Sequence, residues 1–180
     1  MEDLQTAVFG GGCFWCLEAI FGQVRGVQSV ESGYMGGHLP HPSYRQVCGG
    51  DTGHVEVVRV HFDPHVLSYA QLLRVFFAGH DPTTLNRQGN DAGTQYRSVI
   101  FYNSEQQHQE AEKAIACLQS SGEWSKPIVT AVEAATEFFV AEDYHQDYYA
   151  NHSVQPYCQL VIAPKLKKFK EEFAAKDRIA

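Results

Sequence analysis

The chain has 180 residues, of which 44% are hydrophobic and 12% aromatic, so it can bury a substantial core and is not expected to be disordered. Its formal net charge of −7 argues against a nucleic-acid partner, which would be held through phosphate contacts. We expect one domain that spans residues 1–180.

The N-terminus and the cysteines indicate a reducing compartment. Residues 1–6 are acidic and lack the basic start and apolar stretch of a signal peptide, and no segment is long and apolar enough for a membrane span. The five cysteines are an odd number, which argues against a structural disulfide framework. We expect a cytoplasmic monomer with no membrane partner, whose cysteines stay reduced unless they are catalytic or metal-bound.

The first part of the chain alternates short strands and helices. An apolar strand is expected at residues 4–9 and ends in three glycines, after which residues 14–24 show helical spacing. A strand near residues 27–34 then leads into a glycine- and proline-rich stretch at 35–53.

Residues 54–63 form a predicted strand with a two-residue repeat. Glu56 shares one face of this strand with Val58, Val60 and Phe62. A carboxyl group on an apolar face is desolvated, which raises its pKa toward the neutral form. A protonated Glu56 can donate a hydrogen bond or a proton.

The second part of the chain continues the alternation. Ser68 and Gln71 form a capping-box pattern for a helix that ends near residue 79, and the polar loop that follows, 80–95, is long enough to be functional. The remaining expected elements are a strand at 96–103, a helix that begins after Ser104, strands at 128–134 and 157–162, and a final helix from Pro164. This order predicts a mixed sheet covered by helices, of the βαββαβ kind.

Cys13 stands where the first strand ends, where three glycines allow close backbone approach and where a helix begins. The unpaired N–H groups and the dipole of a helix N-terminus lower the pKa of a thiol, and the thiolate is its reactive form. Cys13 is therefore the expected nucleophile of a redox enzyme. Cys48 and Cys117 are expected to be buried free cysteines that only pack.

Cys16 completes a C-x-x-C pair with Cys13, and this pair allows more than one interpretation. It fits a dithiol redox pair, or half of a zinc site, which would need two further ligands. The spacer, Phe14-Trp15, consists of two large rings and indicates a small apolar pocket beside the nucleophile. A thioredoxin-like disulfide oxidoreductase that uses Cys13 and Cys16 stays open as the alternative function, as does a zinc-binding interaction module.

Six motifs between residue 10 and about residue 165 are jointly far more specific than a C-x-x-C pair. They are Gly12-Cys13-Phe14-Trp15, Ser32-Gly33-Tyr34, Pro42-Ser43-Tyr44, Gly53-His54-Val55-Glu56-Val57, Gly93-Thr94-Gln95-Tyr96-Arg97-Ser98 and Tyr144-His145-Gln146. In combination they resemble the peptide methionine sulfoxide reductase A family.

The resemblance implies an α/β (α+β) fold, a two-layer sandwich of a mixed β-sheet with helices around a ferredoxin-like βαββαβ core. It implies reduction of the S epimer of methionine sulfoxide, free or in proteins, to methionine, as a repair of oxidised proteins. Cys13 matches the family's nucleophile and Glu56 its acid. The residues that match substrate contacts are Phe14 and Trp15 around the methyl group, Tyr44 and Tyr96 at the sulfoxide oxygen, and Asp91 in the substrate-facing loop.

The resemblance also implies a reaction cycle without a metal or an organic cofactor. Cys13 attacks the sulfoxide sulfur, methionine leaves, and Cys13 becomes a sulfenic acid. A second cysteine condenses with the sulfenic acid, and thioredoxin, the expected protein partner, reduces the resulting disulfide.

Cys16 and Cys158 are the candidates for the second cysteine. In many relatives the recycling cysteine follows Gly-Tyr near the C-terminus, and Cys158 follows Pro156-Tyr157 at nearly the matching place. The expected strand at 157–162 would fix Cys158 in position, whereas residues three apart on a helical turn lie ~5–6 Å apart at Cβ. We therefore expect Cys16 to resolve the sulfenic acid.

Overall fold

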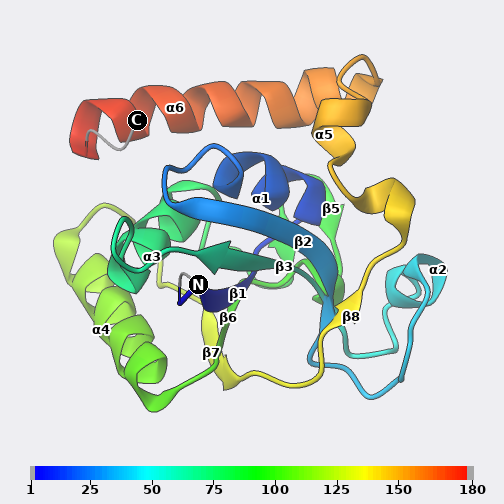
Figure 1. Cartoon of the computed structure of the whole chain (residues 1–180), viewed down its shortest axis with the longest axis horizontal. Coiled ribbons are helices and arrows are strands. Elements are labelled where there is room, and N and C mark those ends of the chain that lie inside the picture. The colour runs from blue at the N-terminus through cyan, green and yellow to red at the C-terminus, as the bar shows by residue number, and fades with distance from the viewer. Residues whose placement is uncertain (1–2, 178–180) are drawn as a thin grey trace.

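The computed structural model describes residues 3–177, which form a six-stranded sheet with its helices packed mainly on one face (Figure 1). The strands lie in the order β7-β6-β1-β3-β2-β8. Their bounds are β1 Gln5–Gly10, β2 Val27–Met35, β3 Val55–Phe62, β6 Val99–Tyr102, β7 Ala131–Ala134 and β8 Phe139–Val140. A separate hairpin pairs β4 (Arg87–Gln88) with β5 (Asp91–Ala92).

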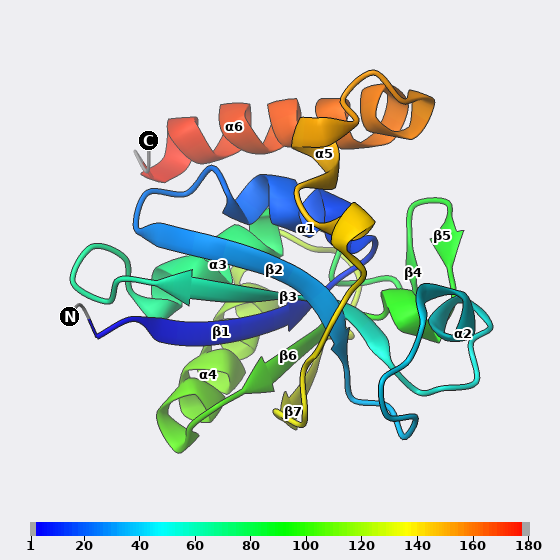
Figure 2. The same cartoon turned by 45° about the vertical axis from the view of Figure 1, so that its right-hand side comes forward.

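The longer helices cover the sheet and the shorter ones lie in its connections. The longer ones are α1 Phe14–Phe21, α3 Tyr69–Ala78, α4 Glu105–Ser121 and α6 Ala163–Asp177. The shorter ones are α2 Tyr44–Cys48 and α5 Tyr148–Asn151, the 3₁₀ turns Thr94–Tyr96 and Asp143–His145, and the π-helical turn Cys158–Ile162. Figure 2 shows α6 lying across α1 on the outside of the molecule.

The βαββαβ arrangement predicted from the sequence is confirmed. β1, α1, β2, β3, α3 and β6 follow one another along the chain, and β1 pairs antiparallel with both β3 and β6 while β2 pairs antiparallel with β3. These pairs give the strand order of a ferredoxin-like core. β7 extends it by pairing parallel with β6, and β8 by pairing antiparallel with β2.

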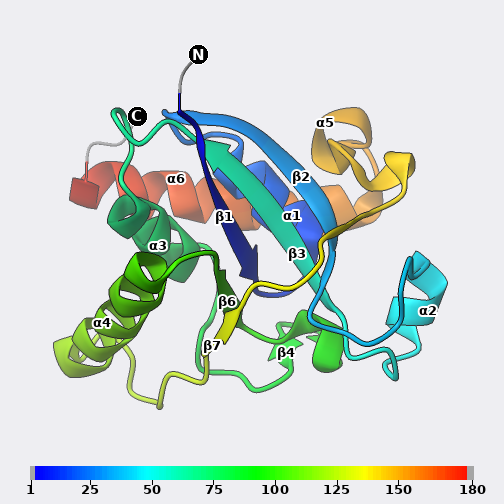
Figure 3. The same cartoon turned by 60° about the horizontal axis from the view of Figure 1, so that its bottom comes forward.

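The central strands are buried on both faces. On the helical face, the ring of Phe9 stacks on Phe21 at 5.2 Å and on Phe76 at 4.9 Å between ring centroids. On the other face, Val8 and Val57 belong to a smaller cluster, and Phe138 of the connection from β7 to β8 packs against it. Figure 3 shows the course of this connection between the two strands. This double burial explains why β1 and β3 carry nearly continuous apolar runs.

The predicted helix starts are confirmed at their capping residues. The Ser68 hydroxyl accepts the backbone N–H of Gln71, and the Gln71 side chain accepts the N–H of Ser68. Ser104 likewise accepts the N–H of Gln107 at the start of α4. These caps satisfy amide groups that have no partner inside the helix.

The strand predicted at residues 157–162 is wrong. The segment forms a π-helical turn that leads directly into α6. Leu160 and Val161 are exposed there while Ile162 is buried, so this short apolar run does not enter a sheet. A run of this length cannot be assigned to strand or helix by periodicity alone, and here the helix that follows it decides.

The ring stack around Phe9 makes a testable contribution to stability. Phe9→Ala removes a fully buried ring, so we expect the free energy of unfolding to fall by ~3–5 kcal/mol. Leu85→Ala is the control, because the Leu85 side chain is 71% exposed and its truncation should change stability by less than ~0.5 kcal/mol. Urea unfolding followed by circular dichroism measures both. Equal losses in the two variants would show that the Phe9 stack does not hold the fold.

Candidate active site

Cys13 occupies the N-cap position of α1, directly after the turn that ends β1. Gly12 has a φ of +93°, a conformation that side-chain-bearing residues rarely adopt, and a Cβ at this position would lie 2.6 Å from Cγ of Gln88. The Gly12 N–H donates to the carbonyl oxygen of Tyr96 at 3.1 Å. The glycines therefore allow the turn to lie against the 80–95 loop and to hold Cys13 there.

The buried ring of His80 packs against the same turn at Gly11. The His80 ring contacts the carbonyl of Phe76 at 2.6 Å and the hydroxyl of Ser98 at 2.8 Å, and a Cβ on Gly11 would meet the ring at 2.9 Å. Burial lowers the pKa of His80 to about 4, so the ring is neutral at physiological pH. His80 is thus a fixed part of the wall behind Cys13.

Glu56 lies at the start of α1, beside Cys13. The Phe14 N–H donates to Oε1 of Glu56 at 3.2 Å, whereas Oε2 is buried and has no hydrogen-bond partner among the described residues. Burial, helped by the charges of Asp91 and Cys16, raises the pKa of Glu56 to about 8 despite the lowering effect of the Phe14 N–H. The burial predicted from the strand pattern is confirmed: the Glu56 side chain is 1% exposed.

Cys13 and Cys16 form a buried pair. The helix start lowers the pKa of Cys13, as predicted, through the backbone N–H of Trp15, but in the substrate-free chain this effect is outweighed and the net direction is upward. Burial raises the pKa of Cys13, and its hydrogen bond to Cys16 and the charge of Glu56 raise it further. The same hydrogen bond lowers the pKa of Cys16, with smaller contributions from Lys165 and Tyr157. Desolvation therefore outweighs the helix dipole at Cys13.

Phe14 forms the inner wall of the site. Its ring is fully buried, and its centroid lies 5.8 Å from that of Tyr34, 6.5 Å from that of Tyr44 and 5.1 Å from that of His145. A ring packed on three sides has a fixed position. Phe14 therefore gives the site one rigid apolar surface.

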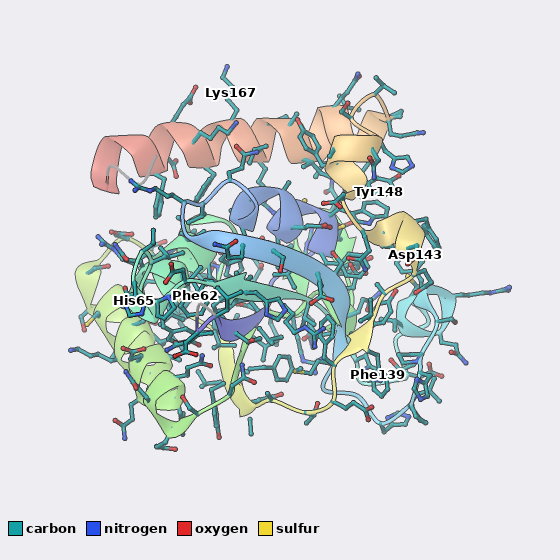
Figure 4. The ribbon with its side chains drawn as sticks, viewed as in Figure 1. Phe62, His65, Phe139, Asp143, Tyr148 and Lys167 are labelled. Atoms are coloured by element: carbon teal, nitrogen blue, oxygen red, sulfur yellow. The ribbon has the colours of Figure 1, made fainter. Side chains whose placement is uncertain are left out.

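Trp15 is half-buried and is held by residues from the C-terminal part of the chain. Its indole N–H donates to Nδ1 of His145 at 3.0 Å, and its ring stacks on Tyr148 at 3.7 Å. Tyr157 packs edge-on against the same ring at 5.6 Å. Figure 4 labels Tyr148 where α5 approaches α1.

Tyr44, Tyr96 and Asp91 reach the site from three different segments. Burial raises the pKa of both tyrosines, and the charge of Glu56 is the next contribution at each, so both lie within electrostatic range of that carboxyl. Asp91 Oδ2 accepts the hydroxyl of Tyr157 at 2.8 Å. The hydroxyls of Tyr44 and Tyr96 thus lie in the electrostatic field of Glu56, and Asp91 is tied to Tyr157.

The remaining cysteines differ from expectation. Cys158 is fully buried at the start of the π-helical turn. Burial raises its pKa, and the charge of Cys16 adds a smaller increase. Cys48 and Cys117 are exposed, so the prediction that they are buried is wrong. Cys48 ends the short helix α2, where its sulfur meets the Tyr44 hydroxyl, and Cys117 lies on α4 just beside the core-facing stripe.

The segment between β8 and α5, residues 141–147, is fastened to both β2 and α1. Gln146 accepts the N–H of Ser32 at 3.0 Å and donates to the carbonyl of Ser32 at 2.9 Å and to that of Ala141 at 3.1 Å. Glu18 on α1 accepts the Ser32 hydroxyl at 2.9 Å and the N–H of Asp147 at 2.7 Å. This strap, as we call residues 141–147, is therefore a fixed wall of the site.

Sequence reasoning missed most of what the C-terminal part adds to the site. Tyr148, Tyr157 and Glu142 lie outside the predicted site residues, and His145 entered only as part of a motif. The available signal was the density of tyrosines between residues 144 and 157 beside the Tyr-His-Gln motif.

Two further findings concern residues 3–177 as a whole. No cluster of three or more His, Cys, Asp or Glu side chains in this range could hold a metal ion, so the zinc interpretation has no ligand set there. Within the same range, no helix is both long and apolar enough to cross a membrane.

Comparison with known proteins gives a consistent result. A family model described as peptide methionine sulfoxide reductase matches residues 5–178. Peptide methionine sulfoxide reductase MsrA of Chromobacterium violaceum is 58% identical over 171 residues, which cover 95% of this chain and 97% of that protein. Among solved structures, reduced Mxr1 of Saccharomyces cerevisiae is 35% identical, with a TM-score of 0.81; the match covers 86% of this chain and 89% of that one. Methionine sulfoxide reductase A of Corynebacterium diphtheriae is also 35% identical, with a TM-score of 0.76; the match covers 86% of this chain and 78% of that one. The chain belongs to the peptide methionine sulfoxide reductase family.

Proposed function

We propose that this chain reduces the S epimer of methionine sulfoxide, free or in proteins, to methionine. The observation that carries the proposal is the carboxyl of Glu56. It is protonated at neutral pH, it lies next to Cys13, and its Oε2 has no partner within the protein. A nucleophile beside a proton donor is what removal of oxygen from a sulfoxide needs.

The first step transfers the sulfoxide oxygen to Cys13. The Cys13 sulfur attacks the sulfoxide sulfur while Glu56 gives a proton to the oxygen, and methionine leaves as Cys13 becomes a sulfenic acid. The proton that the Cys13 thiol loses replaces the one that Glu56 gives, so the step consumes one thiol and one sulfoxide. The positive end of the S–O dipole lies on sulfur, and its approach favours the Cys13 thiolate despite burial.

The substrate contacts follow from the walls of the site. Tyr44 and Tyr96 donate hydrogen bonds to the sulfoxide oxygen on the Glu56 side, and the rings of Phe14 and Trp15 hold the methyl group. Asp91 faces the rest of the substrate. The fixed positions of Phe14 and Trp15 support this assignment, because a rigid pocket distinguishes epimers by shape.

The second step regenerates the enzyme. The Cys16 thiol condenses with the Cys13 sulfenic acid to give a disulfide and water, and the dithiol of thioredoxin then reduces that disulfide. The hydrogen bond within the Cys13–Cys16 pair supports Cys16 in this role. Cys158 lies in a π-helical turn and not in a strand, so the proximity of Cys16 to Cys13 favours Cys16.

Cys13→Ser tests the nucleophile and the substrate together. With excess dithiothreitol, the wild type should convert the S epimer and leave the R epimer, whereas Cys13→Ser should convert neither, because no other thiol can form the first covalent link. Cys117→Ser, which removes an exposed thiol on α4, is the control and should keep wild-type turnover. Chromatography of the separated epimers measures this. Reduction of insulin disulfides without any methionine formation would instead favour the disulfide oxidoreductase.

Glu56→Gln tests the acid. The amide keeps the shape of the side chain but supplies no proton, so single-turnover formation of methionine should slow by ~10²–10⁴-fold. In the wild type the rate should fall as the pH rises through about 8, because Glu56 is protonated only below its pKa, and this limb should be missing in Glu56→Gln. Glu31→Gln, which removes a half-exposed carboxyl paired with Arg59, is the matched control. A wild-type rate in Glu56→Gln would mean that another group protonates the oxygen.

Disulfide mapping tests the resolving cysteine. Enzyme treated with one equivalent of substrate and digested without reductant should give a Cys13–Cys16 crosslink by mass spectrometry. Cys16→Ser should release one methionine per enzyme but lose thioredoxin-dependent turnover, and Cys158→Ser should keep it. A Cys13–Cys158 crosslink in the wild type, together with thioredoxin-dependent turnover in Cys16→Ser, would overturn the assignment.

A further inference from the structure

Glu142, on the strap, joins three tyrosines around the site through one carboxyl group. Its Oε1 accepts the hydroxyl of Tyr34 at 3.0 Å, and its Oε2 accepts the backbone N–H of Tyr44 at 3.1 Å and the hydroxyl of Tyr144 at 3.2 Å. Three donors converge on two oxygens, and an ionised carboxylate suits them best because both of its oxygens act only as acceptors.

The contact with Tyr44 fixes the start of α2. The Tyr44 N–H belongs to the first turn of this helix and has no acceptor within it. A helix of five residues is not stable alone, so its position depends on such outside contacts. The Ser43–Gln46 capping box sets the start of α2, and Glu142 ties that start to the strap. Phe14 and His145 pack against the Tyr44 ring.

The electrostatics agree with this geometry. Although partial burial acts in the opposite direction, the backbone N–H groups of Glu142 and Tyr44, the Tyr34 hydroxyl and the charge of His145 lower the pKa of Glu142. Glu142 is thus ionised at the pH where Glu56 is protonated, and the two carboxyls have opposite tasks. Glu142 holds tyrosines in place, and Glu56 gives a proton.

We propose that Glu142 is a positioning residue for the sulfoxide reduction. By holding the backbone of Tyr44, it directs the Tyr44 hydroxyl toward the oxygen that Glu56 protonates. This inference rests on the proposed function, in which Tyr44 donates to that oxygen. Through Glu142, the strap would therefore contribute to the reaction as well as pack against β2 and α1.

The test is a double-mutant cycle on the single-turnover rate of methionine formation at saturating sulfoxide. Glu142→Gln leaves only one acceptor oxygen, so Tyr44 should shift and the rate should fall by about tenfold or more. Tyr44→Phe removes the hydroxyl but keeps the backbone N–H. If Glu142 acts through that hydroxyl, Glu142→Gln should lower the rate of the wild type and leave the rate of Tyr44→Phe unchanged.

Matched controls separate this role from a structural one. Glu137→Gln removes an exposed carboxyl five residues earlier and should keep the wild-type rate. A structural role predicts that Glu142→Gln slows the wild type and Tyr44→Phe by the same factor, and that result would overturn the proposal. Failure of the wild type to form methionine would refute the proposed function itself, which is a different outcome.

Folding is checked by circular dichroism before the cycle is read. If Glu142→Gln does not fold, Glu142→Asp takes its place, because it keeps the charge but is one methylene too short to reach Tyr34 and Tyr44 together. The expected pattern is the same: a slower wild type and an unchanged Tyr44→Phe. If neither variant folds, the full Glu142 side chain is required for the fold as a whole and the positioning role is refuted.

Discussion

The site depends on a carboxyl group buried at the start of a helix, beside a cysteine. Glu56 sits on β3 among apolar side chains, and its one hydrogen bond within the described residues comes from the first amide of α1. Burial keeps this carboxyl protonated, and the lone hydrogen bond leaves Oε2 free for a substrate. The same burial opposes ionisation of Cys13. In the substrate-free chain both groups are therefore neutral: the Glu56 carboxyl carries its proton, and so does the Cys13 thiol.

This arrangement requires both ends of the chain. The glycine turn after β1 brings Cys13 and Phe14 to Glu56, while the strap and α5 supply the groups that hold Trp15 and Tyr44. The strap is itself fixed by partly buried hydrogen bonds of Gln146 and Glu18, which are costly to break because they would leave polar groups unpaired. Rigid walls on both sides of the nucleophile favour a substrate of defined shape.

Much of the fold and the centre of the site could be predicted from sequence. Period-two alternation placed Glu56 inside, capping boxes placed α3, and the glycines before Cys13 marked the turn, because each is a local rule of backbone or burial. The π-helical turn at Cys158 was mistaken for a strand because a short apolar run has no decisive period. Three other features depend on contacts between distant segments, which no local sequence pattern records. They are the exposure of Cys48, the raised pKa of Cys13 and the hydrogen bond from the Tyr44 N–H to Glu142.

A direct titration of Glu56 tests the central claim that a protonated carboxyl lies beside Cys13. Carboxyl ¹³C chemical shifts of glutamate-labelled enzyme, followed against pH and assigned by comparison with Glu56→Gln, report the pKa of this one group. We expect a midpoint near 8 in the substrate-free enzyme. A midpoint at or below 4.5, the ordinary value, would mean that Glu56 is ionised at neutral pH and cannot be the proton donor.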